Sequence, residues 1–158
     1  MIINGHDGSK YRVYESYPIK QVKQWIVGFK AGLRYNGPDK VVKFYVEETR
    51  GNNVTCHEVE YHLRNGYEWD GASIPKRFQW LIGKPTAHKF RVSSMFHDLG
   101  YENRSRRVLN DVIFYYLLSK SDVPHWKADL MYKAVRGGGH SYYASDTSWF
   151  WRKVRGLL

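Results

Sequence analysis

Four residues in the second half of the chain have the side-chain types of a hydrolytic site. His97 and Asp98 are adjacent, Tyr101 follows them, and Asp111 comes further along the chain. A carboxylate that hydrogen-bonds one imidazole nitrogen fixes the tautomer of the ring and stabilises its charged form. The other nitrogen can then take a proton from water. The pattern predicts His97 as a general base, Asp111 as its orienting carboxylate and Tyr101 as a brace.

Two helices must bring these residues together. We expect one helix over about 87–102 and a second over about 105–119, joined by a turn near Arg104. His97 and Asp111 are equally far from that turn, on opposite sides of it. Positions equidistant from the turn of an antiparallel hairpin lie at the same height, so the two side chains can face each other.

The residue next to His97 suggests a metal site. Consecutive helical residues diverge by about 100°, so Asp98 points elsewhere, toward the loop that contains Asp70 and Ser73. Carboxylates, loop carbonyls and a hydroxyl suit a hard cation such as calcium. Such an ion would polarise a carbonyl and hold a developing oxyanion. We therefore expect Asp98, Asp70 and Ser73 as calcium ligands, with Tyr101 on the helix face that can brace either His97 or Asp98.

Two arginines are candidates for substrate binding, and each candidate residue has a structural alternative. Arg107 precedes Asp111 by one helical turn, so the two can form an ordinary salt bridge. Arg136 lies near the expected end of a helix, where a cation is favoured by the helix dipole. Asp70 and Ser73 can equally cap and brace a turn.

The first half of the chain has the alternation of strands. Apolar and polar residues alternate over 11–14, 41–46 and 54–63, and the last two runs are separated by the turn signal Gly-Asn-Asn at 51–53. Because short turn-separated strands usually pair with their neighbours, an antiparallel β-meander is expected.

The second half has helical spacing. Ser105 is the candidate N-cap of the second helix. A third helix is expected to begin near Asp122, with Pro124 at an early position, and to stop at the glycines 137–139. The fold class is therefore α+β in a single domain over 1–158. Its expected parts are strands over 1–68, a motif loop over 69–85, three helices over 86–139 and an aromatic, basic tail over 140–158.

The composition is that of a globular, basic protein. Of 158 residues, 42% are hydrophobic and 25% charged, and the formal net charge is +10. A positive surface attracts nucleic acid, anionic lipid or an acidic partner, and charge alone does not choose among these. The tail at 148–155 interleaves aromatic and basic residues, which suits a membrane interface or packing on a protein surface. No window has the roughly 18 apolar residues of a membrane span.

Four segments carry a resemblance to a known family. In order, they resemble the motifs D-x-A-S-I-P, H-D-x-x-Y, R-x-x-A-D-x-x-F and M-Y-x-A-V-R-x-G-G of a phage and prophage family called domain of unknown function thirteen-fifty-three. The segments are 69–75 (WDGASIP), 96–101 (FHDLGY), 107–114 (RVLNDVIF) and 131–138 (MYKAVRGG).

The His-Asp-x-x-Tyr series with its later Asp also resembles the phospholipase A(2) superfamily. In those enzymes the His is the base for water, the adjacent Asp binds calcium, and the Tyr and the later Asp brace the His. The resemblance implies a phospholipase-like helix hairpin with these roles carried by His97, Asp98, Tyr101 and Asp111. It also implies calcium-loop carbonyls from around residues 70–73.

Three features depart from these patterns. Asn110 stands where the phage family usually has a small residue. Cys56 is the single cysteine, so the disulfides of the phospholipases are absent. The segment 69–75 replaces their glycine-rich calcium loop and offers a carboxylate and a hydroxyl instead.

Three functions follow from these observations. The first is a calcium-assisted ester hydrolase acting on phospholipid at an anionic membrane. The second is a catalytically silent phage structural or host-interaction protein on the same scaffold, in which His97 and Asp111 only tie two helices together. The third, carried by charge and aromatic content alone, is a nucleic-acid binder. Because the N-terminus lacks a signal peptide, we expect synthesis in the host cytoplasm, with association with the virion as a further expectation.

Overall fold

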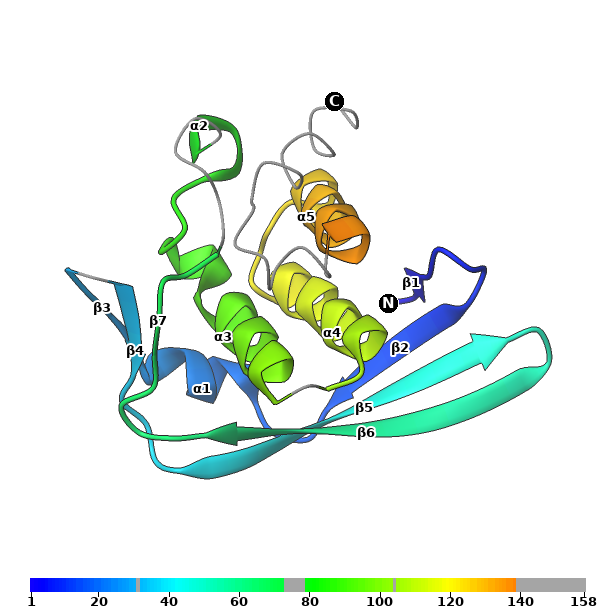
Figure 1. The fold of residues 1–158 in the computed structure, drawn as a ribbon, viewed down its shortest axis with the longest axis horizontal. Helices are drawn as coiled ribbons and strands as arrows, with labels where there is room; N and C mark the ends of the chain where they lie inside the picture. The colour runs from blue at the N-terminus through cyan, green and yellow to red at the C-terminus, as the bar shows by residue number, and fades with distance from the viewer. Residues whose placement is uncertain (31, 73–78, 104, 139–158) are drawn as a thin grey trace.

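The computed structural model describes residues 1–30, 32–72, 79–103 and 105–138 (Figure 1). Antiparallel sheets at the N-terminus are followed by three longer helices, which confirms the predicted α+β class. The strands are β1 (Ile3–Asn4), β2 (Lys10–Glu15), β3 (Ile26–Phe29), β4 (Gly32–Tyr35), β5 (Lys40–Arg50), β6 (Asn53–Leu63) and β7 (Glu68–Trp69). The helices are α1 (Ile19–Gln24), α2 (Gln79–Ile82), α3 (His88–Glu102), α4 (Arg107–Lys120) and α5 (His125–Gly138).

A long hairpin of β5 and β6 dominates the larger sheet, whose strand order is β1-β2-β5-β6. The predicted alternation is present along β5 and in β6 from residue 57 on, whereas residues 53–56 of β6 are all exposed. Phe44 pairs with Val59, and both side chains are buried on one face. Phe96 of α3 packs edge-on against Phe44 and Tyr61, with ring centroids 5.3 and 5.0 Å apart. At the turn, Gly51 has a φ of 58°, a conformation that favours glycine.

The strand pairing departs from a simple meander at two places, β2 with β5 and β4 with β7. The strand β2 pairs with β5 rather than with the next strand in sequence, because α1, β3 and β4 intervene. β3 and β4 form a second, three-stranded sheet with β7. The helix α1 was not predicted, and at six residues it is too short to show a clear helical period.

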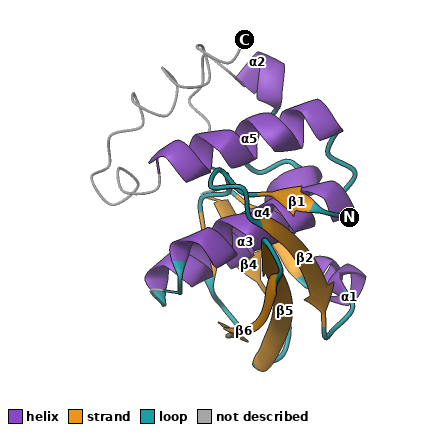
Figure 2. Ribbon diagram, turned by 90° about the vertical axis from the view of Figure 1, so that its right-hand side faces the viewer, coloured by secondary structure: helices purple, strands orange, loops and turns teal. Residues whose placement is uncertain are grey.

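The three C-terminal helices follow the predicted ranges closely. α3 and α4 lie on the inner face of the larger sheet, and α5 packs on α4 from the opposite side (Figure 2). The predicted cap of α4 is wrong: the residue before the helix is Arg106, not Ser105, and it makes no side-chain capping hydrogen bond. The predicted loop over 69–85 contains the short helix α2. Within the described part of the chain, no helix has the length and apolar character needed to cross a membrane.

Candidate active site

The predicted face-to-face pair of the helix hairpin is present. His97 on α3 and Asp111 on α4 meet with an Nε2–Oδ1 distance of 2.9 Å. The Asp111 side chain is completely buried and that of His97 is 8% exposed, so the pair lies inside the helix layer with the ring near its edge. The ring of His97 also contacts the rings of Tyr101 and Phe114, each with centroids 4.5 Å away.

Asp111 is the hub of this site. The hydroxyl of Tyr101 donates to the same Oδ1 atom at 2.8 Å. The other oxygen, Oδ2, accepts a hydrogen bond from Nη1 of Arg136 at 2.9 Å. Arg107 places its Nε 3.9 Å from Oδ2, in the i, i+4 geometry of a salt bridge. Side chains from α3, α4 and α5 therefore converge on one carboxylate.

These contacts decide the charge of Asp111 and the tautomer of His97. Burial alone would raise the pKa of Asp111, but the hydrogen bond and charge of His97, with the bonds from Tyr101 and Arg136, outweigh it and lower the pKa. An ionised carboxylate only accepts hydrogen bonds. Nε2 of His97 must therefore be the donor, and any proton exchange with a substrate has to pass through Nδ1.

The residue that brings the two helices together, Asn110, was not predicted as a site residue. Its Nδ2 donates to the backbone carbonyl of His97 at 3.0 Å, and its Oδ1 accepts from the hydroxyl of Tyr61 at 2.9 Å. A side chain at Gly100 would collide with the amide of Asn110. The glycine within the helix was the sequence signal for this close approach, since glycine otherwise weakens a helix interior.

The structure places the two predicted arginines as follows. Arg136 contacts Asp111, in addition to lying at the end of α5. Nη2 of Arg107 donates to the carbonyl of Arg136 at 2.6 Å, while its Nε is buried without a hydrogen-bond partner among the described residues. Both alternatives considered for Arg107, the salt bridge and a role toward substrate, therefore remain compatible with its position.

The structure describes two of the three predicted calcium ligands. Asp98 is partly buried on α3, Asp70 is exposed just after β7, and Ser73 lies outside the described residues. In the ranges the structure describes, no three His, Cys, Asp or Glu side chains are grouped as a metal site would require. The calcium site thus stays a prediction from the sequence.

The comparison with known proteins decides the family. A family model described as "Protein of unknown function (DUF1353)" matches residues 49–135, more than half of the chain. The chain belongs to this family. The DUF1353 match contains His97, Asp98, Tyr101 and Asp111 and ends one residue before Arg136.

A curated relative of this DUF1353 chain is the uncharacterized protein y4jT of Sinorhizobium fredii. The two are 39% identical over 80 residues, which cover 45% of this chain and 24% of the relative. The match therefore spans about a quarter of the relative's length. No solved structure matches this chain.

Proposed function

We propose that the protein is a hydrolase in which His97 activates water and Asp111 orients and stabilises the imidazole. The observation that carries this proposal is the buried carboxylate of Asp111, whose Oδ1 accepts from His97 at 2.9 Å and from Tyr101 at 2.8 Å. This geometry holds the ring in the tautomer that a base needs, with Nδ1 as the proton acceptor.

The proposed reaction is the hydrolysis of an ester. Nδ1 of His97 removes a proton from water as the water oxygen attacks the ester carbonyl, which gives a tetrahedral oxyanion and an imidazolium. The imidazolium, paired with ionised Asp111, then returns the proton to the leaving alkoxide as the carbon–oxygen bond breaks. A positioned base of this kind contributes about 10²–10⁴-fold to the rate.

The proposed reaction does not require calcium, and calcium is varied in the assays. Asp70 and Asp98 are the two carboxylates of the predicted set that the structure describes, and calcium takes six to eight oxygen ligands. The described side chains do not supply such a shell, so no step of the reaction depends on the ion. Each assay should be run with calcium and with a chelator, which shows directly whether the ion contributes.

The proposed substrate surface is an anionic membrane. Trp126 is 51% exposed at the start of α5, and Nζ of Lys127 lies 5.5 Å from its ring centroid. Partial burial and the nearby charge of Lys89 lower the pKa of Lys127, so two lysines lie close to each other beside this exposed indole. Tryptophan and lysine together favour the boundary between lipid headgroups and acyl chains.

The experiment that tests hydrolysis is a panel of nitrophenyl esters of increasing chain length and of anionic and zwitterionic phospholipid vesicles. The wild type should hydrolyse at least one member, and His97→Gln should lose about 10²–10⁴-fold in rate while remaining folded by circular dichroism. If the wild type is inert across the panel, with and without calcium, the hydrolase proposal fails.

One observation favours a second function, that of a catalytically silent binding protein. Asp111 is contacted by side chains from three helices, which is also how a purely structural clamp would be built. In that case the wild type would be inert, and His97→Gln would lower the melting temperature. The Trp126→Ala variant would then test the binding surface, by cosedimentation with anionic vesicles against zwitterionic ones.

A further inference from the structure

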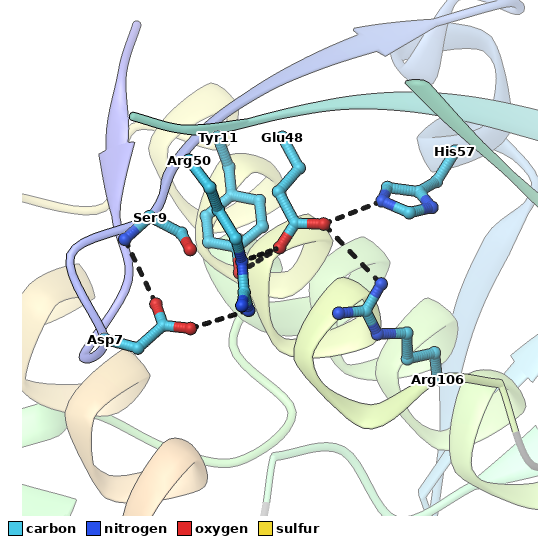
Figure 3. Close-up of polar contacts among 7 residues, drawn as sticks. All are labelled: Asp7, Ser9, Tyr11, Glu48, Arg50, His57 and Arg106. Carbon is cyan, nitrogen blue, oxygen red and sulfur yellow. Dashed lines mark hydrogen bonds and ion pairs between the residues drawn. The ribbon is translucent and has the colours of Figure 1, made fainter. Parts of the chain in front are cut away.

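A second buried carboxylate, Glu48, lies where the start of α4 approaches the larger sheet (Figure 3). Its Oε1 contacts Nε2 of His57 at 2.9 Å and Nη1 of Arg106 at 3.6 Å. Its Oε2 accepts from the hydroxyl of Tyr11 and from Nε of Arg50, both at 3.2 Å. One side chain on β5 therefore links β2, β6 and the residue that precedes α4.

The charge of Glu48 is stabilised by these partners. Burial works to raise the pKa of Glu48, but the hydrogen bonds from His57 and Tyr11 and the charge of Arg106 outweigh it and lower the pKa. Removing the partners of a buried charge is costly because the charge is then uncompensated. The 3.6 Å ion pair with this buried carboxylate ties the half-exposed side chain of Arg106 to the larger sheet.

Arg106 is placed to pass this restraint to the candidate active site. It is the residue before α4, where no side-chain cap fixes the helix start. Its backbone carbonyl accepts from the N–H of Asn110 at 3.1 Å. The next residue, Arg107, contacts both Asp111 and the carbonyl of Arg136. A shift of Arg106 would thus displace the first turn of α4, which carries Asn110 and leads into Asp111.

We propose that Glu48 is a positioning residue for the candidate active site. By holding Arg106, it sets the start of α4 so that Asp111 meets His97. The catalytic consequence rests on the proposed function, whereas the effect on the His97 ring is measurable without any substrate.

The test is a comparison of Glu48→Gln with the matched variant Glu47→Gln, whose side chain lies on the opposite face of β5. The readout is the ¹⁵N and ¹H NMR signal of the His97 ring at one fixed pH, assigned with His97→Gln. We expect Glu48→Gln to shift the His97 Nε2–H resonance and Glu47→Gln to leave it unchanged. A folded Glu48→Gln protein with wild-type His97 signals would overturn the proposal.

A double-mutant cycle keeps the test decisive if Glu48→Gln folds poorly. Arg106→Gln changes a half-exposed residue, and we expect it to shift the His97 signals in the same direction as Glu48→Gln. The double variant should shift them no further than the larger single change, because both act through one contact. Additive shifts would contradict the proposal. If the His97 signals respond as expected but no ester is hydrolysed, the positioning role stands and the hydrolase proposal alone fails.

Discussion

The side chains around Asp111 and those around Glu48 form two regions of the molecule that contain the same kinds of residues. Each carboxylate contacts Nε2 of a histidine at 2.9 Å, a tyrosine hydroxyl and two arginines. The regions differ in burial: His97 is 8% exposed beside a fully buried Asp111, whereas His57 is 23% exposed beside a Glu48 that is 7% exposed. An imidazole–carboxylate distance therefore does not by itself identify a catalytic pair.

The elements that supply the partners explain the difference. Asp111 lies among helices α3, α4 and α5 with a completely buried side chain, and its arginine partners Arg107 and Arg136 are 37% and 19% exposed. Glu48 draws its partners from strands and from the residue before α4, and its arginines reach solvent. Charges interact more strongly where water is excluded. We therefore expect changes at Asp111 to have larger effects than matched changes at Glu48.

The largest effect is expected for Asp111→Asn. The substitution removes the charge that Arg136 and Arg107 face while keeping the shape, and loss of one partner of a buried ion pair costs about 3–5 kcal/mol. Urea unfolding of Asp111→Asn and Glu48→Gln measures both losses. A larger loss in Glu48→Gln would reverse the ranking of the two regions.

Acid should weaken the Asp111 region in a defined pH window. Because the pKa of Asp111 is lowered on folding, its stabilisation is fully present above the unfolded value of about 3.9. It is lost as pH falls through the folded pKa. Unfolding free energies measured from pH 5 downward should therefore drop more steeply in the wild type than in Asp111→Asn. Parallel curves for the two proteins would contradict the assigned charge.

The close approach of α3 and α4 should leave no room for an added methyl group at Gly100. Gly100→Ala places its Cβ against the amide of Asn110, and overpacking of this kind costs about 1–3 kcal/mol. Thermal melts of Gly100→Ala and the wild type measure this loss. A Gly100→Ala variant as stable as the wild type would show that the helices can separate freely.

The last comparison concerns the tyrosine hydroxyls. Tyr101→Phe removes one hydrogen bond to the ionised Asp111, which is worth about 1.5–3 kcal/mol, and Tyr11→Phe does the same at Glu48. Because Tyr101 contacts the carboxylate that orients the proposed base directly, Tyr101→Phe should lower the rate of ester hydrolysis more than Tyr11→Phe does. Equal rate losses in the two variants would remove the distinction between the regions.

The Asp111 region could be predicted from the sequence because its parts are local. His97, Tyr101 and Asp111 lie on two consecutive helices with a short turn, so counting residues from that turn was enough to pair them. Arg136 was recognised as a candidate residue, but its contact with Asp111 depends on the packing of α5 on α4, which periodicity does not give.

The Glu48 region could not be predicted, because its partners come from strand pairing and from a distant helix start. Glu48 and His57 become neighbours only through the register of β5 and β6, and Arg106 reaches them from the other half of the chain. The predicted alternation ended at Val46, whereas β5 continues to Arg50 and buries Glu48. Asn110 was noted as unusual, but its role required the position of Gly100 on the facing helix.

The central claim is that His97 activates water, and that contact with a carboxylate does not by itself give a histidine this role. One matched pair of variants tests this claim most directly. His97→Gln and His57→Gln should be measured side by side for kcat/KM on the best substrate of the wild type, with melting temperatures recorded for both. The account predicts a loss of about 10²–10⁴-fold in His97→Gln and a much smaller loss in His57→Gln, which reaches the site only through Glu48. Equal rates in the two folded variants would contradict it.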